Sequence, residues 1–77
     1  MTAGRMIRLL CSNPLFQCWL AQQVGLPKVA YFGCIGILKK RCGVSEFREF
    51  KSNEQAAEKL AEHVYQFNEY CKKIQYN

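Results

Sequence analysis

Aspartate is missing from this chain of 77 residues, and histidine occurs only once, as His63. All six acidic side chains are glutamates. A Ser/His/Asp triad, a two-metal site and most carboxylate clusters for metal ions therefore lack their parts. The sequence predicts that the protein is not an enzyme and that it has no catalytic residues.

Cysteine pairs with the spacing of a zinc ribbon or a thioredoxin-like site are also missing, because no two of the five cysteines form a Cys-x-x-Cys pair. We therefore expect no metal site and no other cofactor. In a reducing compartment, free cysteines behave as small buried apolar side chains. A disulfide between Cys34 and Cys42, facing each other across a hairpin, is the alternative.

Long apolar runs are absent as well. The longest apolar stretch near the N-terminus ends at Leu20 and is interrupted by Arg8, Asn13 and Pro14, so it predicts neither a membrane span nor the core of a signal peptide. We expect a soluble intracellular protein, cytoplasmic or nuclear, that does not bind membranes. Residues 1–12 contain two arginines and no acid, which leaves import into mitochondria as an alternative.

The apolar content that is present suffices for one small domain. Hydrophobic residues make up 49% of the chain and aromatic residues 13%. Ordering the chain costs about 1.5 kcal/mol per residue, so burial and entropy must nearly cancel and leave little stability for a strained site. Binding is therefore favoured over catalysis.

Charge is divided unevenly between the two halves of the chain. Residues 1–45 carry six basic side chains and no acid, whereas residues 46–77 carry five basic side chains and six glutamates. Such an asymmetry is typical of a protein with a polyanionic partner. We expect RNA or an acidic protein surface as that partner, and no small-molecule substrate.

The C-terminal third predicts a long amphipathic helix. Ser52 and Gln55 have the spacing of a capping box, so we expect the helix to begin at Asn53 and to continue to Tyr76. His63 is expected on its surface. The expected core face consists of Ala57, Leu60, Ala61, Val64, Phe67 or Asn68, Cys71 and Ile74.

Aromatic residues on this helix are more numerous than one core stripe needs. Tyr65, Phe67 and Tyr70 therefore predict a partner interface, and one form of it could be a homodimer through the C-terminal helix.

A second helix is predicted nearer the N-terminus. Pro14 follows Asn13 at a first helical position, Gly25 suits the C-terminal cap, and Pro27 prevents continuation. We expect this helix over residues 14–24, with a further helical turn over residues 5–11.

The middle of the chain predicts a β-hairpin. Residues 29–38 are rich in β-formers, residues 44–51 read as a second strand, and Lys39 to Gly43 form a basic turn between them. The expected fold is therefore α+β, a two-layer α-β-β(-β)-α sandwich with both helices on one face of a small antiparallel sheet. Residues 1–12 are expected to be an extension or short helix, and residues 13–77 a single domain.

Two segments carry a resemblance to a known family. One is the Gly25-Leu26-Pro27 motif with Tyr31 four residues after the proline, and the other is the predicted C-terminal helix. Together they resemble a double-stranded-RNA-binding domain. Positions of this chain that fall in register with the family's second helix are Ser52, Ala56, Ala61, Val64 and Tyr65.

Departures from the family pattern concern its RNA contacts. Asn53, Glu54 and Ala57 occupy positions where the family has lysines that contact phosphates, and the loop that enters the minor groove is missing. The chain thus resembles a shortened, degenerate member, and the resemblance implies RNA binding or a shift to protein partners.

The functional prediction is a non-catalytic binding module that uses its basic N-terminal half and the hairpin tip. The alternative is a small protein inhibitor or adaptor, for instance viral, that docks on a nucleic-acid-processing enzyme. The residues predicted to contact RNA or an acidic partner are Lys28, Lys39, Lys40, Arg41 and Lys51.

Overall fold

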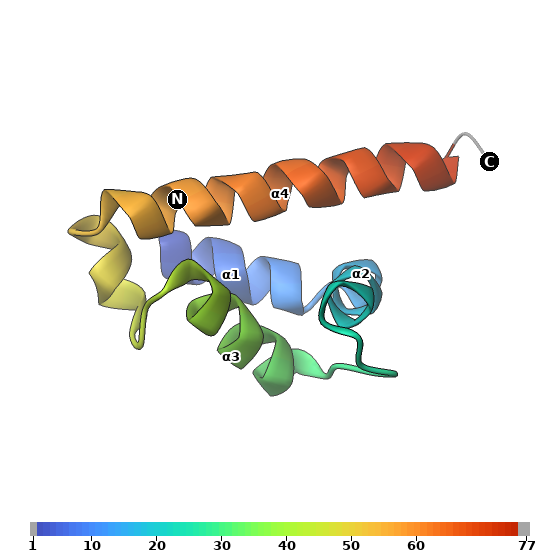
Figure 1. The fold of residues 1–77 in the computed structure, drawn as a ribbon, viewed down its shortest axis with the longest axis horizontal. Coiled ribbons are helices and arrows are strands. Elements are labelled where there is room, and N and C mark those ends of the chain that lie inside the picture. The colour runs from blue at the N-terminus through green and yellow to red at the C-terminus, as the bar shows by residue number, and fades with distance from the viewer. Residues whose placement is uncertain (1, 76–77) are drawn as a thin grey trace.

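The computed structural model describes residues 2–75, and helices are the only regular secondary structure in this part of the chain (Figure 1). It contains four α-helices and one short 3-10 helix. In chain order these are α1 (Ala3–Cys11), α2 (Pro14–Val24), α3 (Tyr31–Cys42), the 3-10 helix η1 (Phe47–Lys51) and α4 (Glu54–Gln75).

The long helix α4 lies across the other three helices (Figure 1). Helix α1 packs against α2, α3 and η1, and α4 packs against α2, α3 and η1. Helix α4 has 22 residues, which corresponds to about 33 Å, and the structure measures 40 Å along its longest axis. The last turns of α4 extend past α2 (Figure 1).

An aromatic cluster joins α2 to α4 at the centre of the core. The Phe16 ring meets the Phe67 ring edge to face at a centroid distance of 4.9 Å, and Trp19 lies 5.5 Å from Phe16. Ile7 of α1 and Leu38 of α3 are fully buried in the same core. The N-terminal residues expected to be an extension or short helix thus supply a helix that packs into this core.

The predicted boundaries of α2 are confirmed, and its caps explain them. The Asn13 side chain accepts a hydrogen bond from the Leu15 amide at 2.9 Å, and Pro14 occupies the first turn. Gly25 ends the helix in the left-handed conformation, with a φ of 72°, which only glycine adopts without strain.

The α+β prediction is wrong, because residues 2–75 contain no strand. The segment expected as the first strand lies mostly within α3, where Cys34, Leu38 and Cys42 are buried at intervals of four residues. That spacing places them on one face of a helix and overrides the β propensity of the neighbouring residues. Cys34 and Cys42 are both free and lie about 12 Å apart along this helix axis, so the alternative disulfide is also wrong.

The second expected strand is the helix η1, and no hairpin joins the two segments. A capping box forms here, because the Glu49 carboxylate accepts hydrogen bonds from the amides of Ser45 and Glu46 at 2.7 and 2.6 Å. Phe47 and Phe50, three residues apart, fit the period of a 3-10 helix. Without a sheet, the structure also lacks the layer that the resemblance to the RNA-binding domain implied.

The long C-terminal helix is confirmed, although its cap and its buried face differ from the prediction. The Asn53 side chain, not that of Ser52, accepts from the Ala56 amide at 3.1 Å. His63 is buried, whereas Ala57 and Ala61 are exposed. The buried residues of α4 are Ala56, Leu60, His63 and Phe67. Tyr76 lies outside the described residues.

Candidate functional site

The outer side of α3 carries the largest exposed apolar side chain of the described structure. Phe32 is 83% exposed, and the edge of its ring meets Tyr31 at a centroid distance of 5.1 Å. A ring of this size normally reduces its contact with water by burial, so its exposure makes Phe32 a candidate contact residue.

Two exposed glycines follow Phe32 on this side of the helix. A Cβ atom at Gly36 would meet nothing within 4 Å, and one at Gly33 would only touch the Val29 side chain at 3.6 Å. Neither glycine has a positive φ, so neither backbone conformation nor internal packing requires glycine here. Each lowers helix stability by about 1 kcal/mol relative to alanine, and nothing inside the described structure offsets that cost.

Lysines continue the same surface toward the end of α3. Lys39 follows Phe32 by seven residues and therefore lies on the same side of the helix, two turns further on. Lys40 is exposed next to it. We call this surface the α3 face; it consists of Phe32, Gly33, Gly36, Lys39 and Lys40.

The ring of Phe47 lies near one cation from α3 and one from α1. The Lys39 Nζ lies 5.4 Å from the centroid of the Phe47 ring, and the Arg8 guanidinium carbon lies 5.3 Å from it. Both cations are within the range of a cation–π contact, which is worth about 0.5 to 1 kcal/mol at exposed sites. The side chains of Lys39 and Arg8 therefore both lie beside the Phe47 ring.

A hollow of about 450 Å³ adjoins Phe47. Arg8, Arg48 and Lys51 line it, together with the first turn of α1. The Arg48 side chain donates to the Glu46 carboxylate at 2.6 Å, and both side chains are exposed, so this ion pair contributes little to stability. The hollow adds a second group of cations beside the α3 face.

The five cations predicted to contact a partner do not form one cluster. Lys39, Lys40 and Arg41 lie in the last turn of α3 rather than at a hairpin tip. Lys28 lies between α2 and α3, before the opposite end of α3, and Lys51 ends η1. The structure thus brings Lys39 and Lys51 near Phe47 and leaves Lys28 apart.

The three aromatic residues predicted as a partner interface on α4 have different surroundings. Tyr65 is 65% exposed. Phe67 belongs to the core, so its placement at an interface is wrong. Tyr70 is half-buried, and its ring stacks on Phe67 at a centroid distance of 6.5 Å. Tyr65 alone of the three presents a free aromatic surface.

His63 lacks the neighbours of a catalytic histidine. Its Nδ1 lies 2.6 Å from the Lys59 carbonyl oxygen, and its Nε2 is buried without a hydrogen-bond partner. The imidazole packs edge to face against Trp19. No nucleophile or carboxylate is hydrogen-bonded to the ring, so it serves as a core residue.

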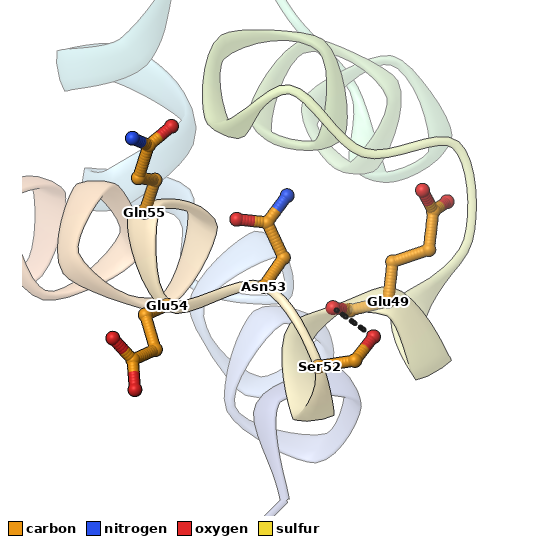
Figure 2. Close-up of a pocket in the computed structure, with 5 residues that line it drawn as sticks. All are labelled: Glu49, Ser52, Asn53, Glu54 and Gln55. Atoms are coloured by element: carbon orange, nitrogen blue, oxygen red, sulfur yellow. Dashed lines mark hydrogen bonds between the residues drawn. The ribbon is translucent and has the colours of Figure 1, made fainter.

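Another hollow, of about 540 Å³, lies where η1 meets α4. Figure 2 shows that the carboxylates of Glu49 and Glu54 point away from each other there, and that Ser52 donates to the Glu49 carbonyl oxygen at 3.5 Å. Two acids arranged in this way cannot share a substrate as a general acid and base. Residues 2–75 also hold no group of three side chains placed to bind a metal ion.

Three of the five thiols are buried in the core, as the sequence predicts. Cys11 and Cys34 share a hydrogen bond. This bond, together with burial, raises the pKa of Cys11, and the same bond lowers the pKa of Cys34. Burial also raises the pKa of Cys42. Cys18 is exposed.

We expect a thiol reagent to modify Cys18 first and the three buried cysteines only on unfolding, because the reactive thiolate must form in contact with water. The measurement is mass spectrometry of the folded protein after timed exposure to iodoacetamide, with a urea-unfolded sample as the control. Modification of Cys34 as fast as that of Cys18 would contradict the buried position of α3.

Comparisons with known proteins add no family. The chain matches no protein-family model, no curated protein and no solved structure. Within the described residues, no helix is both long enough and apolar enough to cross a membrane. The functional conclusion therefore rests on the surfaces described above.

Proposed function

We propose that this protein is a non-catalytic binding module that docks an acidic protein segment on the α3 face. The single observation that carries the proposal is the exposed sequence of α3, in which a bare aromatic ring, two glycines and two lysines follow one side of the helix. None of these residues is needed on that side for the core, which α3 reaches through Cys34, Leu38 and Cys42.

Charge supports an acidic partner. From residue 2 to residue 45 the chain has six basic side chains and no acid, so α1 and α3 carry positive charge, and α1, α2 and α3 carry none of the glutamates. Such a charge distribution attracts acidic surfaces and raises the rate of association. Lys39 and Arg8 extend it around Phe47.

Shape supports a polypeptide as the partner. Exposed glycines let another backbone approach α3 closely, above all at Gly36, where no neighbour lies within 4 Å of a Cβ position. The exposed aromatic residue beside them supplies an anchor for an apolar pocket or seam. An amphipathic helix with glutamates on one edge and small apolar residues on the other would complement the α3 face.

The proposal is tested with two designed helical peptides of about 20 residues that differ only in carrying glutamate or glutamine at the charged positions. We expect the glutamate peptide to bind at least about tenfold more tightly, and its affinity to fall as salt rises. The double variant K39S/K40S should weaken this binding by about tenfold. The measurement is fluorescence anisotropy of the labelled peptides.

The matched control is K59S/K73S, which removes two lysines from α4 and leaves the same net charge as K39S/K40S. It should change the affinity by less than about twofold. Equal weakening by both double variants, or equal binding of both peptides, would reject the α3 face. A duplex RNA that binds more tightly than the glutamate peptide, with the loss confined to K39S/K40S, would reject a protein partner.

A further inference from the structure

A second contact surface lies along α4 and involves none of the α3 face. A groove of about 350 Å³ separates α4 from α1, and its lining is mostly apolar. Met6 of α1 forms one side, and Ala57 and Ala61 form the other. Tyr65 follows Ala61 by four residues, so it lies on the same side of α4 one turn further on, and it is 65% exposed.

We propose that α4 pairs antiparallel with α4 of a second copy of this chain, so that Tyr65 of each copy packs beside Ala61 of the other. The antiparallel direction is what makes the surface self-complementary. A large exposed ring on one copy faces the small side chain and the apolar groove on its partner, and the twofold axis repeats the contact.

The charged residues of α4 also fit an antiparallel pairing in which Ala61 lies beside Tyr65 of the other copy. Pairing Ala61 with Tyr65 of the other copy centres the two helices on residue 63. In that register Glu54 faces Lys72 of the other copy, because each residue lies nine positions from the centre. Glu54, Ala61, Tyr65 and Lys72 are separated by seven, four and seven residues, which places all four on one stripe of the helix. The dimer therefore gains two ion pairs between copies.

The other acids of α4 reduce the gain from these ion pairs. Glu58 faces Asn68 of the other copy, Glu62 faces Val64 and Glu69 faces Ala57, so none is set directly against a like charge, but Glu58 lies one position from Glu69 of the other copy. Lys72 lies 3.6 Å from Glu69 within its own chain, and both side chains are largely exposed. An exposed pair of this kind is worth less than about 1 kcal/mol, so Lys72 can turn to Glu54 of the partner at little cost.

The size of the surface sets the expected affinity. A helix of 22 residues offers a face of about 33 Å by 11 Å, or roughly 360 Å² per copy, and the flank of α1 adds to it. Stable complexes bury about 800 Å² per partner. The face of α4 is smaller than this, so we expect a weak, reversible dimer that forms only at high protein concentration.

The test is sedimentation equilibrium of the full chain over concentrations from about 1 to 500 µM. We expect the wild type to shift from monomer to dimer within this range. Ala61→Arg should abolish the shift, because the long side chain occupies the place of the partner's Tyr65. Lys59→Glu, a charge reversal on another side of α4, is the matched control and should leave the shift in place.

Two charge reversals make the register itself testable. E54K and K72E should each weaken dimerisation by about tenfold, since each sets like charges against each other twice. Mixing the two single variants should restore a dimer, because the mixed pair again joins a positive to a negative side chain at both ends. Circular dichroism confirms that each variant remains folded.

A wild type that stays monomeric at the highest concentration would overturn the proposal. Dimerisation that survives Ala61→Arg would also overturn it, because the contact would then lie elsewhere. Failure of the mixed single variants to associate would reject the antiparallel register.

Discussion

Replacing Phe16 with alanine should remove a large share of the protein's stability. Phe16 is fully buried and contacts the rings of Trp19 and Phe67, so it joins α2 to α4. Removing a buried phenylalanine side chain lowers the free energy of unfolding by about 3 to 5 kcal/mol. A domain of 77 residues has a total of only about 4 to 12 kcal/mol.

Urea denaturation followed by circular dichroism measures this loss. The control is Leu15→Ala at the neighbouring position, where the side chain is 36% exposed, and it should cost less than about 1 kcal/mol. If Phe16→Ala were no more destabilising than Leu15→Ala, the aromatic cluster would not be the centre of the core.

The double variant G33A/G36A should become more stable and bind less well. Alanine raises helix stability by about 1 kcal/mol at each position, and the added Cβ atoms meet no backbone in the described structure. The free energy of unfolding should therefore rise by about 2 kcal/mol. Affinity for the glutamate peptide should fall by at least about fivefold, because the new methyl groups hold the partner away from the helix.

Gly4 supplies the contrast for this prediction. A Cβ atom there would lie 3.1 Å from the Phe47 ring, so Gly4→Ala gains helix propensity but forces the ring to move. We expect Gly4→Ala to give no gain in stability, measured by the same urea denaturation.

A stabilised G33A/G36A variant with unchanged affinity for the glutamate peptide would show that Gly33 and Gly36 do not serve the binding of a partner.

The parts of the fold that the sequence predicts correctly are those with local stop and start signals. Asn13, Pro14 and Gly25 define α2 by their own hydrogen-bonding and backbone preferences, so no knowledge of the rest of the chain is needed. The long helix α4 is predicted in the same way from its apolar spacing and the absence of glycine and proline.

Helix α3 is the element that local reasoning misplaces. Tyrosine, phenylalanine and isoleucine favour strands, and two glycines disfavour helices, so propensity alone predicts a strand. The contrary signal is the interval of four between Cys34, Leu38 and Cys42, which become the buried side of the helix. The β-formers in the same segment favour a strand, and they outweigh this spacing in a reading by propensity.

The α3 face could not be identified before the helix was known. Phe32, Gly36 and Lys39 share a surface only at a period of 3.6 residues, whereas in a strand Phe32 and Gly36 would lie on the side opposite Gly33 and Lys39. Charge alone identifies Lys39 and Lys40 in the sequence, but it does not identify the residues that lie next to them on the surface. Similarly, the burial of His63 depends on which side of α4 faces Trp19, and that follows from tertiary packing.

The most direct test of the α3 face as the binding surface is a nuclear magnetic resonance titration of the isotope-labelled protein with the glutamate peptide. The amide signals of Phe32, Gly33, Gly36, Lys39 and Lys40 should shift most, with the signals of α4 largely unchanged. Shifts gathered on α4, or spread evenly over the basic residues of η1 and α1 without the two glycines, would contradict it.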